Sequence, residues 1–258
     1  MSNDSISKTL TVAIALCVVC SIVVSISAVT LRPAQVANKE RDLKRNILEA
    51  AGMYDPTQKV EDQFSRFNAK IVDLDTGKFT DAVDAGSYDE IAAAKDPAMS
   101  EALSKDEDIA KISRQEKYAK VYTIEDDNGI ETLVLPIRGY GLWSTLYGFI
   151  ALESDLNTVI GLGFYDQKET PGLGGEVDNP RWKALWHGKE IYGDSFDHVA
   201  ISVVKGTVDN QSDPKAIHKV DGLSGATLTS RGVNNMLHFW MGEDGYAKFL
   251  ANLKQGDA

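Results

Sequence analysis

Cysteine is nearly absent from this 258-residue chain, and the two cysteines, Cys17 and Cys20, both lie in an apolar N-terminal segment. The rest of the chain therefore contains no disulfide and is indifferent to the redox compartment. Histidine is also scarce, and the four histidines lack the spacing of metal ligands, so we predict no metal site. They are His187, His198, His218 and His238.

Positive charge is in deficit, since the chain carries a formal net charge of −11. This acidic balance argues against a nucleic-acid-binding protein, which needs a basic face, and against docking on anionic lipid through a polybasic patch. The chain also lacks a Walker phosphate loop and a dinucleotide fingerprint, so we do not expect it to bind a nicotinamide dinucleotide. No Ser-His-Asp set is evident, and we predict no catalytic residue.

One long apolar run is present at the N-terminus. Residues 9–31 contain no charged side chain. As a helix they would rise about 35 Å, enough to cross a hydrocarbon core of about 30 Å. We therefore predict a transmembrane helix over 9–31, preceded by a short cytoplasmic tail, 1–8. A cleaved signal peptide is the alternative, although its apolar region should have only about 7–15 residues. The C-x-x-C pair Cys17 and Cys20 fits either a redox or metal site or small packing residues on one helix face.

Beyond the anchor, apolar periodicity predicts helices over 39–51 and 59–69. The stretch 73–111 is acidic and rich in alanine, which is typical of short helices and surface loops. We therefore predict that residues 32–115 form a helical, acidic N-terminal part of the soluble region.

From residue 120 the pattern changes to that of strands. The expected strands are 121–124 and 132–135 around the turn Asp127-Asn-Gly129, 146–152 and 159–164 around a turn at 154–157, and 199–204. Further helices are expected over 179–186, 230–241 and 244–253. The predicted fold class is α+β, with one N-terminal transmembrane helix followed by an antiparallel-sheet domain with packed helices over residues 116–258.

The most informative stretch begins at Asp221 and reads Asp-Gly-Leu-Ser-Gly-Ala-Thr-Leu-Thr-Ser-Arg, a loop of small residues that leads into an amphipathic helix. Thr227, Thr229 and Ser230 lie where the helix N-cap is expected. Unpaired backbone N–H groups and the helix dipole suit such a start to a phosphate, and Arg231 adds a positive charge beside it. Ordinary capping and turn formation are the alternative for this loop.

The string Asp221-x-x-Ser224-Gly225-Ala226-Thr227 matches the flavinylation signature of proteins that carry FMN through a phosphoester bond to the final Thr or Ser. Three further stretches support the resemblance: Gly139-Tyr-Gly-Leu-Trp143 with Tyr147-Gly148, Glu169-Thr-Pro-Gly-Leu-Gly-Gly175 and Phe239-Trp-Met-Gly242. Over nearly its whole length the chain resembles the C subunit of the Na+-translocating NADH:quinone reductase, and more loosely the G subunit of the related Rnf complex. Only residues 73–115 match weakly.

The resemblance implies a covalent FMN on Thr227, attached by a separate flavin transferase that uses FAD as donor. The candidates for further flavin contacts are Asp221, Ser224, Gly225, Ala226, Leu142, Trp143, Glu169, Thr170, Leu173, Gly174 and Lys205. Leu142, Trp143 and Leu173 would cover the flavin ring, and the Thr170 hydroxyl would meet its polar edge.

Three of these candidates have a second interpretation. Trp143 is also explained as a core aromatic residue, which is the more common position of a tryptophan, and Lys205 is equally explained as a plain surface lysine. Asp221 serves either recognition by the transferase or capping of its own loop.

The resemblance also implies an electron-carrying subunit of a bacterial inner-membrane complex. Such a complex passes electrons from NADH towards ubiquinone and exports Na+, and its other membrane subunits would be the partners of this chain. Two alternatives remain open. One is an Rnf-type subunit with the same flavin chemistry, and the other is an anchored extracytoplasmic module without a flavin.

Membrane orientation is a point on which charge and resemblance disagree. Lys8 is the only basic residue before the span, whereas Arg32, Lys39, Arg41, Lys44 and Arg45 follow it. The positive-inside rule would therefore place the large domain in the cytoplasm. The resemblance places it in the periplasm, and we follow the resemblance.

Overall fold

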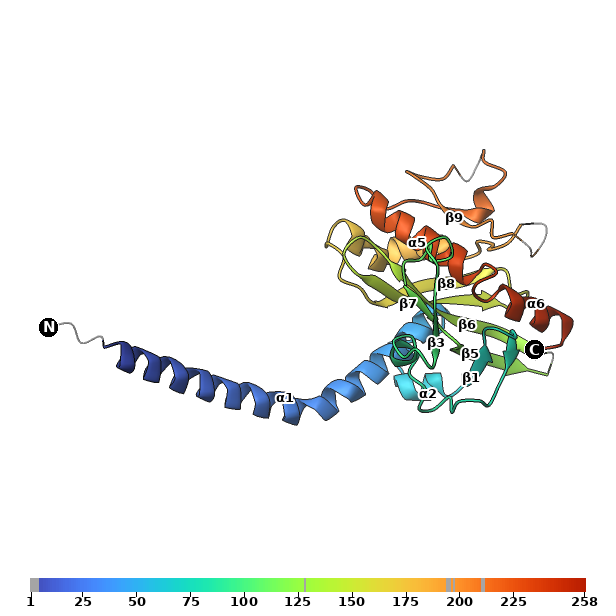
Figure 1. The fold of residues 1–258 in the computed structure, drawn as a ribbon. Helices are drawn as coiled ribbons and strands as arrows, with labels where there is room; N and C mark the ends of the chain where they lie inside the picture. Colours follow the sequence, from blue (N-terminus) through green and yellow to red (C-terminus); the bar gives the residue numbers. More distant parts are fainter. Residues whose placement is uncertain (1–4, 128, 194–195, 197, 210–211) are drawn as a thin grey trace. The chain divides into compact units, whose positions relative to one another are not determined.

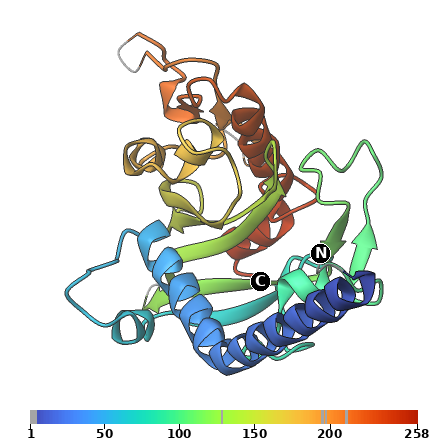
Figure 2. The same cartoon turned by 90° about the vertical axis from the view of Figure 1, so that its left-hand side faces the viewer.

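A computed structural model of the chain describes residues 5–127, 129–193, 196, 198–209 and 212–258. Contacts divide the chain into two units, Met1–Leu43 and Lys44–Ala258. Figures 1 and 2 show the elements from two directions. In chain order these are α1 (Ile6–Ala50), α2 (Val60–Phe64), β1 (Asn68–Asp73), β2 (Lys78–Phe79), α3 (Glu90–Ala93), β3 (Ser100–Ala102), β4 (Arg114–Glu116), β5 (Tyr118–Asp126), β6 (Gly129–Tyr140), β7 (Thr145–Glu153), β8 (Val159–Asp166), the 3-10 helix η1 (Gly174–Asp178), α4 (Pro180–Lys183), η2 (Ala184–Trp186), β9 (Ser202–Val203), η3 (Ala216–His218), β10 (Lys219–Val220), α5 (Thr227–Trp240) and α6 (Ala247–Gln255).

The N-terminal apolar run forms the first part of α1, which continues without interruption to Ala50. Residues 5–42 are all exposed, and among the described residues only α1 has the length and composition of a membrane span. The helix predicted over 39–51 is present as the last part of α1, and it is continuous with the N-terminal apolar run instead of separate from it. Pro33 lies inside α1. Its missing N–H leaves one backbone hydrogen bond unmade, but here it does not end the helix.

The Lys44–Ala258 unit is built on a six-stranded antiparallel sheet with the strand order β2-β1-β5-β6-β7-β8. Both predicted hairpins are confirmed: Tyr122 of β5 lies opposite Val134 of β6, and Ile150 of β7 lies opposite Leu162 of β8. Asn128, in the first predicted turn, lies outside the described residues. With helices packed beside this sheet, the predicted α+β class is confirmed.

Helices cover both faces of the sheet, and two glycines allow the close approach. A Cβ atom on Gly139 of β6 would lie 2.7 Å from the Cβ of Met236, so α5 packs directly on one face. A Cβ on Gly161 of β8 would lie 2.6 Å from the carbonyl oxygen of Ala50, at the end of α1. The buried stripe of α5 predicted from periodicity therefore faces the main core, as Figure 1 shows for the helix as a whole.

The N-terminal part of the soluble region differs from the prediction. The helix expected over 59–69 ends at Phe64, and the chain from Asn68 forms β1, which pairs with β5. The helical assignment of 32–115 was therefore wrong from residue 68 onward, and the main sheet crosses the boundary expected at 115 and 116. The physical reason is that the neighbouring residues Ile71 and Val72 are both buried. Adjacent side chains of a strand point to opposite faces of the sheet, so a strand in a sheet that is covered on both faces can bury both residues.

The C-terminal elements agree with the prediction more closely. The short helix predicted over 179–186 is present as α4 and η2, with the Asn179 side chain accepting the Arg181 N–H at its start. The strand predicted over 199–204 is shorter, because only β9 pairs, in parallel with β10. The helix predicted from residue 230 begins earlier, at Thr227.

Candidate functional site

The loop before α5 presents Thr227 to solvent. Ala226 is the N-cap residue, with φ −124° and ψ 50° and no capping side chain, and Thr227 is the first helical residue. The prediction that Thr227, Thr229 or Ser230 caps the helix was therefore wrong. Thr227 is exposed, and its hydroxyl has no hydrogen-bond partner within the described part of the chain. This hydroxyl is available for reaction.

The two neighbouring hydroxyls are buried and engaged. Ser230 Oγ accepts a hydrogen bond of 2.9 Å from the Leu223 N–H, which ties the loop back onto the first turn of α5. Thr229 Oγ1 donates a hydrogen bond of 2.7 Å to Glu169 Oε2. Gly225 has a φ of +72°, a left-handed conformation that favours glycine. The loop is thus fixed around Thr227 while Thr227 itself stays free.

Glu169 is the residue that joins the separate stretches of the site. It is buried, and its Oε1 accepts hydrogen bonds from the N–H groups of Leu142, Trp143 and Ser144 at 3.1, 2.9 and 3.2 Å. Burial raises the pKa of this carboxyl, but the hydrogen bonds from the Trp143 N–H, the Thr229 hydroxyl and the other two amides outweigh burial and hold the pKa below its ordinary value. Glu169 is therefore an anion that fixes the 142–144 loop against α5.

Glycines make room for this carboxylate. A Cβ on Gly174 would lie 2.5 Å from Thr229 Oγ1 and 2.6 Å from Glu169 Oε2, and one on Gly141 would lie 2.7 Å from Glu169 Oε1. These distances are shorter than real side chains show, so a larger residue at either position would push the three stretches apart. Gly174, predicted as a flavin contact, is buried and makes space inside the site.

Four exposed apolar side chains lie on the stretches that these contacts join, and we call them the apolar rim: Leu142, Trp143, Leu173 and Leu228. Their exposed fractions are 37%, 66%, 44% and 50%. Trp143 is thus not a core aromatic residue. Two contacts bring the rim residues together. Glu169 ties the 142–144 loop, which carries Leu142 and Trp143, to α5. The Leu173 side chain packs closely on Gly225, since a Cβ atom added to Gly225 would lie 3.1 Å from Leu173 Cδ2.

Leu228 was missed from the sequence, although a signal was present. It is an apolar residue of α5 that lies outside the stripe formed by Val233, Met236, Leu237 and Trp240. An apolar residue off the buried face of a helix points to a contact that the fold does not supply.

A hollow of ≈ 300 Å³ lies beside Thr227, and we call it the Thr227 hollow. It is lined by Val203, Val204, Lys205, Gly206, Gly222, Leu223, Thr227, Ser230, Arg231 and Asn234. Lys205 and Arg231 are exposed, and no acidic side chain is among the lining residues. The structure therefore brings Lys205 next to Thr227, which distinguishes it from a lysine elsewhere on the surface.

Asp221 ties the start of its loop to the 206–208 stretch. Its Oδ1 accepts a hydrogen bond of 2.7 Å from the Val208 N–H, and its carbonyl oxygen accepts one of 2.8 Å from Trp182 Nε1. The next residue, Gly222, donates its N–H to the Gly206 carbonyl oxygen at 2.9 Å. These bonds hold the start of the loop in place, and recognition of Asp221 by a transferase stays a prediction.

Two more predicted contacts, Ser224 and Thr170, are exposed. The Thr170 carbonyl oxygen accepts hydrogen bonds from the N–H groups of Leu173 and Gly175 at 3.1 and 2.9 Å, which closes the turn that carries Leu173 of the apolar rim. The hydroxyls of Ser224 and Thr170 have no partner among the described residues.

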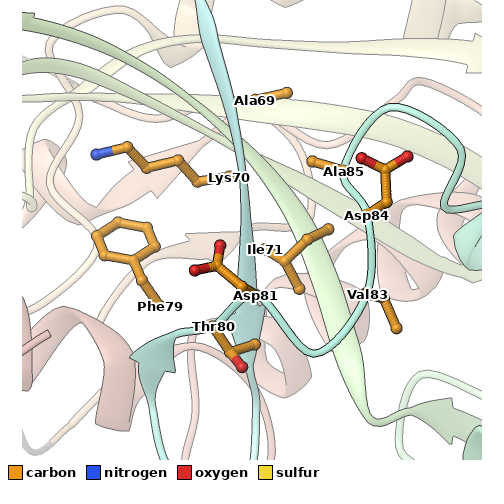
Figure 3. Close-up of a pocket in the computed structure, with 9 residues that line it drawn as sticks. All are labelled: Ala69, Lys70, Ile71, Phe79, Thr80, Asp81, Val83, Asp84 and Ala85. Carbon is orange, nitrogen blue, oxygen red and sulfur yellow. The ribbon is translucent and has the colours of Figure 1, made fainter.

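Figure 3 shows a different hollow of ≈ 600 Å³, formed around β1 and β2, that shares no residue with the Thr227 hollow. Its one basic residue, Lys70, is already engaged: its Nζ lies 2.5 Å from Glu125 Oε1 and 4.7 Å from the centre of the Phe79 ring. Among the described residues, no group of three or more His, Cys, Asp or Glu side chains could hold a metal ion. The Thr227 region is therefore the strongest candidate site.

The residues at this site fit FMN. A free hydroxyl at the start of a helix, with Lys205 and Arg231 beside it, suits an attached phosphate group. Exposed leucine and tryptophan side chains of the apolar rim suit a flat aromatic ring, which would cover apolar surface that is otherwise in contact with water.

Comparison with known proteins gives an independent assignment. The family model of the FMN-binding domain matches residues 141–242, a range that contains Thr227, Lys205 and the whole apolar rim. The C subunit of the Na(+)-translocating NADH-quinone reductase of Pseudomonas aeruginosa is 55% identical, covering 100% of this chain and 99% of that protein. The protein of the same name from Vibrio alginolyticus is 46% identical, covering 99% and 98%.

A solved structure agrees with this assignment. The crystal structure of NqrC from Shewanella oneidensis superposes with a TM-score of 0.77 at 38% identity and covers 85% of this chain and 99% of that one. Identity across the full length and agreement of the fold give the same answer: the chain belongs to the NqrC family, the C subunits of the Na(+)-translocating NADH-quinone reductases.

Proposed function

We propose that this chain carries FMN bound through a phosphoester to Thr227 and relays electrons from NADH towards ubiquinone within a Na+-translocating reductase complex. The names of its relatives supply the donor, the class of acceptor and the ion. The observation that carries the proposal is the exposed, unpartnered Thr227 hydroxyl, which lines one hollow together with Lys205 and Arg231 and is followed in the chain by Leu228 of the apolar rim.

Attachment requires a second protein. Thr227 Oγ forms a bond to the phosphorus of the FMN half of FAD while the pyrophosphate P–O bond breaks, and AMP leaves. The hydroxyl proton must pass to a base, and no described side chain hydrogen-bonds to Thr227. A threonine hydroxyl is a weak nucleophile without such a base. The base therefore belongs to a flavin transferase, for which this chain is the substrate.

After attachment, the residues of this chain hold and shield the cofactor. The phosphodiester keeps one negative charge, which Lys205, Arg231 and the N-terminal N–H groups of α5 stabilise. The apolar rim would exclude water from the ring, and the exposed Thr170 hydroxyl can meet a polar ring atom. FMN itself supplies the redox chemistry, while the protein sets its position and surroundings. Glu169 acts indirectly, because it fixes the loop that carries Leu142 and Trp143.

The anchor and the partners follow from α1 and the family. We assign α1 as an uncleaved, single-pass span in a bacterial inner membrane, where it joins the other subunits of the complex. The Lys44–Ala258 unit would lie in the periplasm, against the positive-inside rule. Labelling the wild-type chain in intact cells with a membrane-impermeant amine reagent tests this: reaction of surface lysines only after the inner membrane is opened would place the unit in the cytoplasm.

Covalent attachment is tested by producing the full chain together with its flavin transferase and inspecting a denaturing gel for flavin fluorescence. We expect a fluorescent band for wild type and for Ser224→Ala, and none for Thr227→Ala. Ser224 is the matched control because it is an exposed hydroxyl of the same loop, three positions before Thr227.

Two outcomes would contradict the proposal. Loss of fluorescence in Ser224→Ala with retention in Thr227→Ala would move the attachment site. A dark wild-type band, with the transferase shown active on another substrate, would leave an anchored module without a covalent flavin.

A further inference from the structure

A hollow of ≈ 570 Å³ lies in the Lys44–Ala258 unit apart from the Thr227 hollow, and we call it the Arg138 hollow. It shares no lining residue with the Thr227 hollow. Its lining comes from α3, the 111–114 stretch and the adjoining ends of β6 and β7: Ile91, Ala94, Lys95, Lys111, Ile112, Ser113, Arg114, Arg138, Tyr140, Thr145 and Tyr147.

The lining contains four basic side chains and no acidic one, in a chain whose net charge is −11. Lys95 and Lys111 are exposed and have no ion-pair partner among the described residues. Arg114 is held by Ser100, to whose hydroxyl and carbonyl oxygens its Nε and Nη2 donate at 2.9 and 2.7 Å. Three of the four positive charges therefore have no carboxylate beside them in the described structure.

Arg138 is the fourth cation, and it is buried, with 9% of its surface exposed. Its Nη2 forms an ion pair with the Glu116 carboxylate and donates to the Arg114 carbonyl oxygen at 3.0 Å. Its Nε is buried and has no hydrogen-bond partner. Buried N–H groups are almost always paired, and an unpaired one is costly, so this donor calls for an acceptor that the chain does not supply.

The carboxylates of Asp108 and Glu90 do not line the hollow. Both oxygens of Asp108 are occupied by the Ile112 and Ser113 N–H groups, at 2.7 and 2.9 Å. Glu90 accepts the Lys120 N–H at 2.6 Å, and burial, followed by the nearby Glu116 charge, raises its pKa to about 8, so it is largely protonated at neutral pH. The surplus charge facing the hollow is positive.

We propose that the Arg138 hollow binds a small oxyanion ligand, one that carries phosphate or carboxylate groups. Its volume is within the range of about 300–1,000 Å³ found for small-molecule sites. The guanidinium group of Arg138 and the ammonium groups of Lys95 and Lys111 match oxygen acceptors of this kind, since such charge-assisted hydrogen bonds are among the stronger ones. Tyr140 and Tyr147 provide flat walls for the remainder of the molecule.

The hollow lies at the base of the hairpin that carries two residues of the apolar rim. Tyr140 and Thr145 are the last residue of β6 and the first of β7, and they are paired. Leu142 and Trp143 lie in the loop between them. The ligand would therefore contact a structural element of the Thr227 region without entering it, and its binding does not depend on the proposed flavin attachment.

The test is calorimetric titration of the full chain in neutral detergent with inorganic pyrophosphate and, separately, with citrate, at fixed ionic strength. We expect saturable binding of at least one probe at one site. We expect Lys95→Gln/Lys111→Gln to weaken it at least about tenfold, because two of the unpaired charges are removed. Lys78→Gln, which removes an exposed lysine of β2 outside the hollow, should bind like wild type.

Arg138→Lys adds a second variant that keeps the charge beside Glu116 and removes the orphan Nε donor. We expect it to fold, as judged by an unchanged far-UV spectrum, and to bind more weakly than wild type. The proposal is overturned if wild type shows no saturable heat with either probe, or if the Lys95/Lys111 double variant binds as tightly as Lys78→Gln. Preference for pyrophosphate identifies a phosphate ligand, and preference for citrate a polycarboxylate.

Discussion

Replacing Glu169 by glutamine should destabilise the Lys44–Ala258 unit without changing its shape. Glutamine has nearly the same volume, so the space made by Gly174 and Gly141 stays filled. Glutamine carries no negative charge, and its side-chain NH2 group donates hydrogen bonds, whereas both oxygens of the glutamate carboxylate accept them. The three backbone N–H groups that now donate to a carboxylate would donate to a neutral amide oxygen, and the Thr229 hydroxyl would have to turn and accept.

The size of the effect follows from these contacts. A hydrogen bond to a charged group contributes about 1.5–3 kcal/mol, and a neutral one about 0.5–1.5 kcal/mol. Because the three amides share one oxygen of Glu169, their losses are not independent, and we expect a total of about 2 kcal/mol. Glu101→Gln is the matched control, since Glu101 is exposed, and surface changes of this kind usually stay within about 0.5 kcal/mol.

Urea unfolding of the full chain in neutral detergent, followed by tryptophan fluorescence, measures this difference. The midpoint should fall for Glu169→Gln and stay in place for Glu101→Gln, with the slope unchanged in both. A loss for Glu169→Gln no larger than that of the control would refute the conclusion that this carboxylate joins the loop to α5.

The same carboxylate predicts a pH dependence. The pKa of Glu169 in the folded chain lies below its ordinary value of 4.5. The unfolded state therefore binds more protons in acid, and the contribution of Glu169 is complete above about pH 4.5 and is lost as the pH falls through the folded pKa. Wild type should lose stability over this acid range relative to Glu169→Gln, in which this group does not titrate. A constant difference between the two across that range would contradict the assignment of Glu169 as an anion.

Three further predictions concern the surroundings of Thr227. Gly174→Ala should lower the unfolding free energy by about 1–3 kcal/mol, because its methyl group would lie 2.5 Å from Thr229 Oγ1; an unchanged urea midpoint would contradict this. Trp143→Ala should leave stability within about 0.5 kcal/mol, because the side chain is 66% exposed, yet raise quenching of flavin fluorescence by iodide; equal quenching would remove Trp143 from the ring contacts. Asp221→Ala should speed hydrogen exchange at the Val208 amide, which loses its acceptor at 2.7 Å, and unchanged exchange would contradict the link between Asp221 and this stretch.

Local patterns in the sequence were sufficient for several elements. The uncharged run at the N-terminus is part of α1, the alternating segments form β5 to β8, and the helical spacing after Arg231 gives the buried face of α5. These features depend on neighbours within one or two turns or on the alternation of a strand, so a short window contains the information. The small-residue loop before α5 also predicted a helix start close to Thr227, although the first helical residue was expected at 230.

Other features depend on residues far apart in the chain. Glu169 contacts the Trp143 N–H across 26 positions and the Thr229 hydroxyl across 60, and no periodicity reveals either bond. Lys205 lies beside Thr227 only because the glycine at 222 allows its stretch to pass close to the Val204 carbonyl oxygen.

The sequence by itself therefore determined the long apolar N-terminal helix, the fold class and the small-residue loop that leads into α5. Tertiary structure decided that β1 joins the main sheet, that Ala226 rather than a hydroxyl residue caps α5, and that Glu169 acts through its neighbours. The physical reason is that hydrogen bonds and burial between distant segments exist only after sheet and helices have packed, and there they outweigh local preferences.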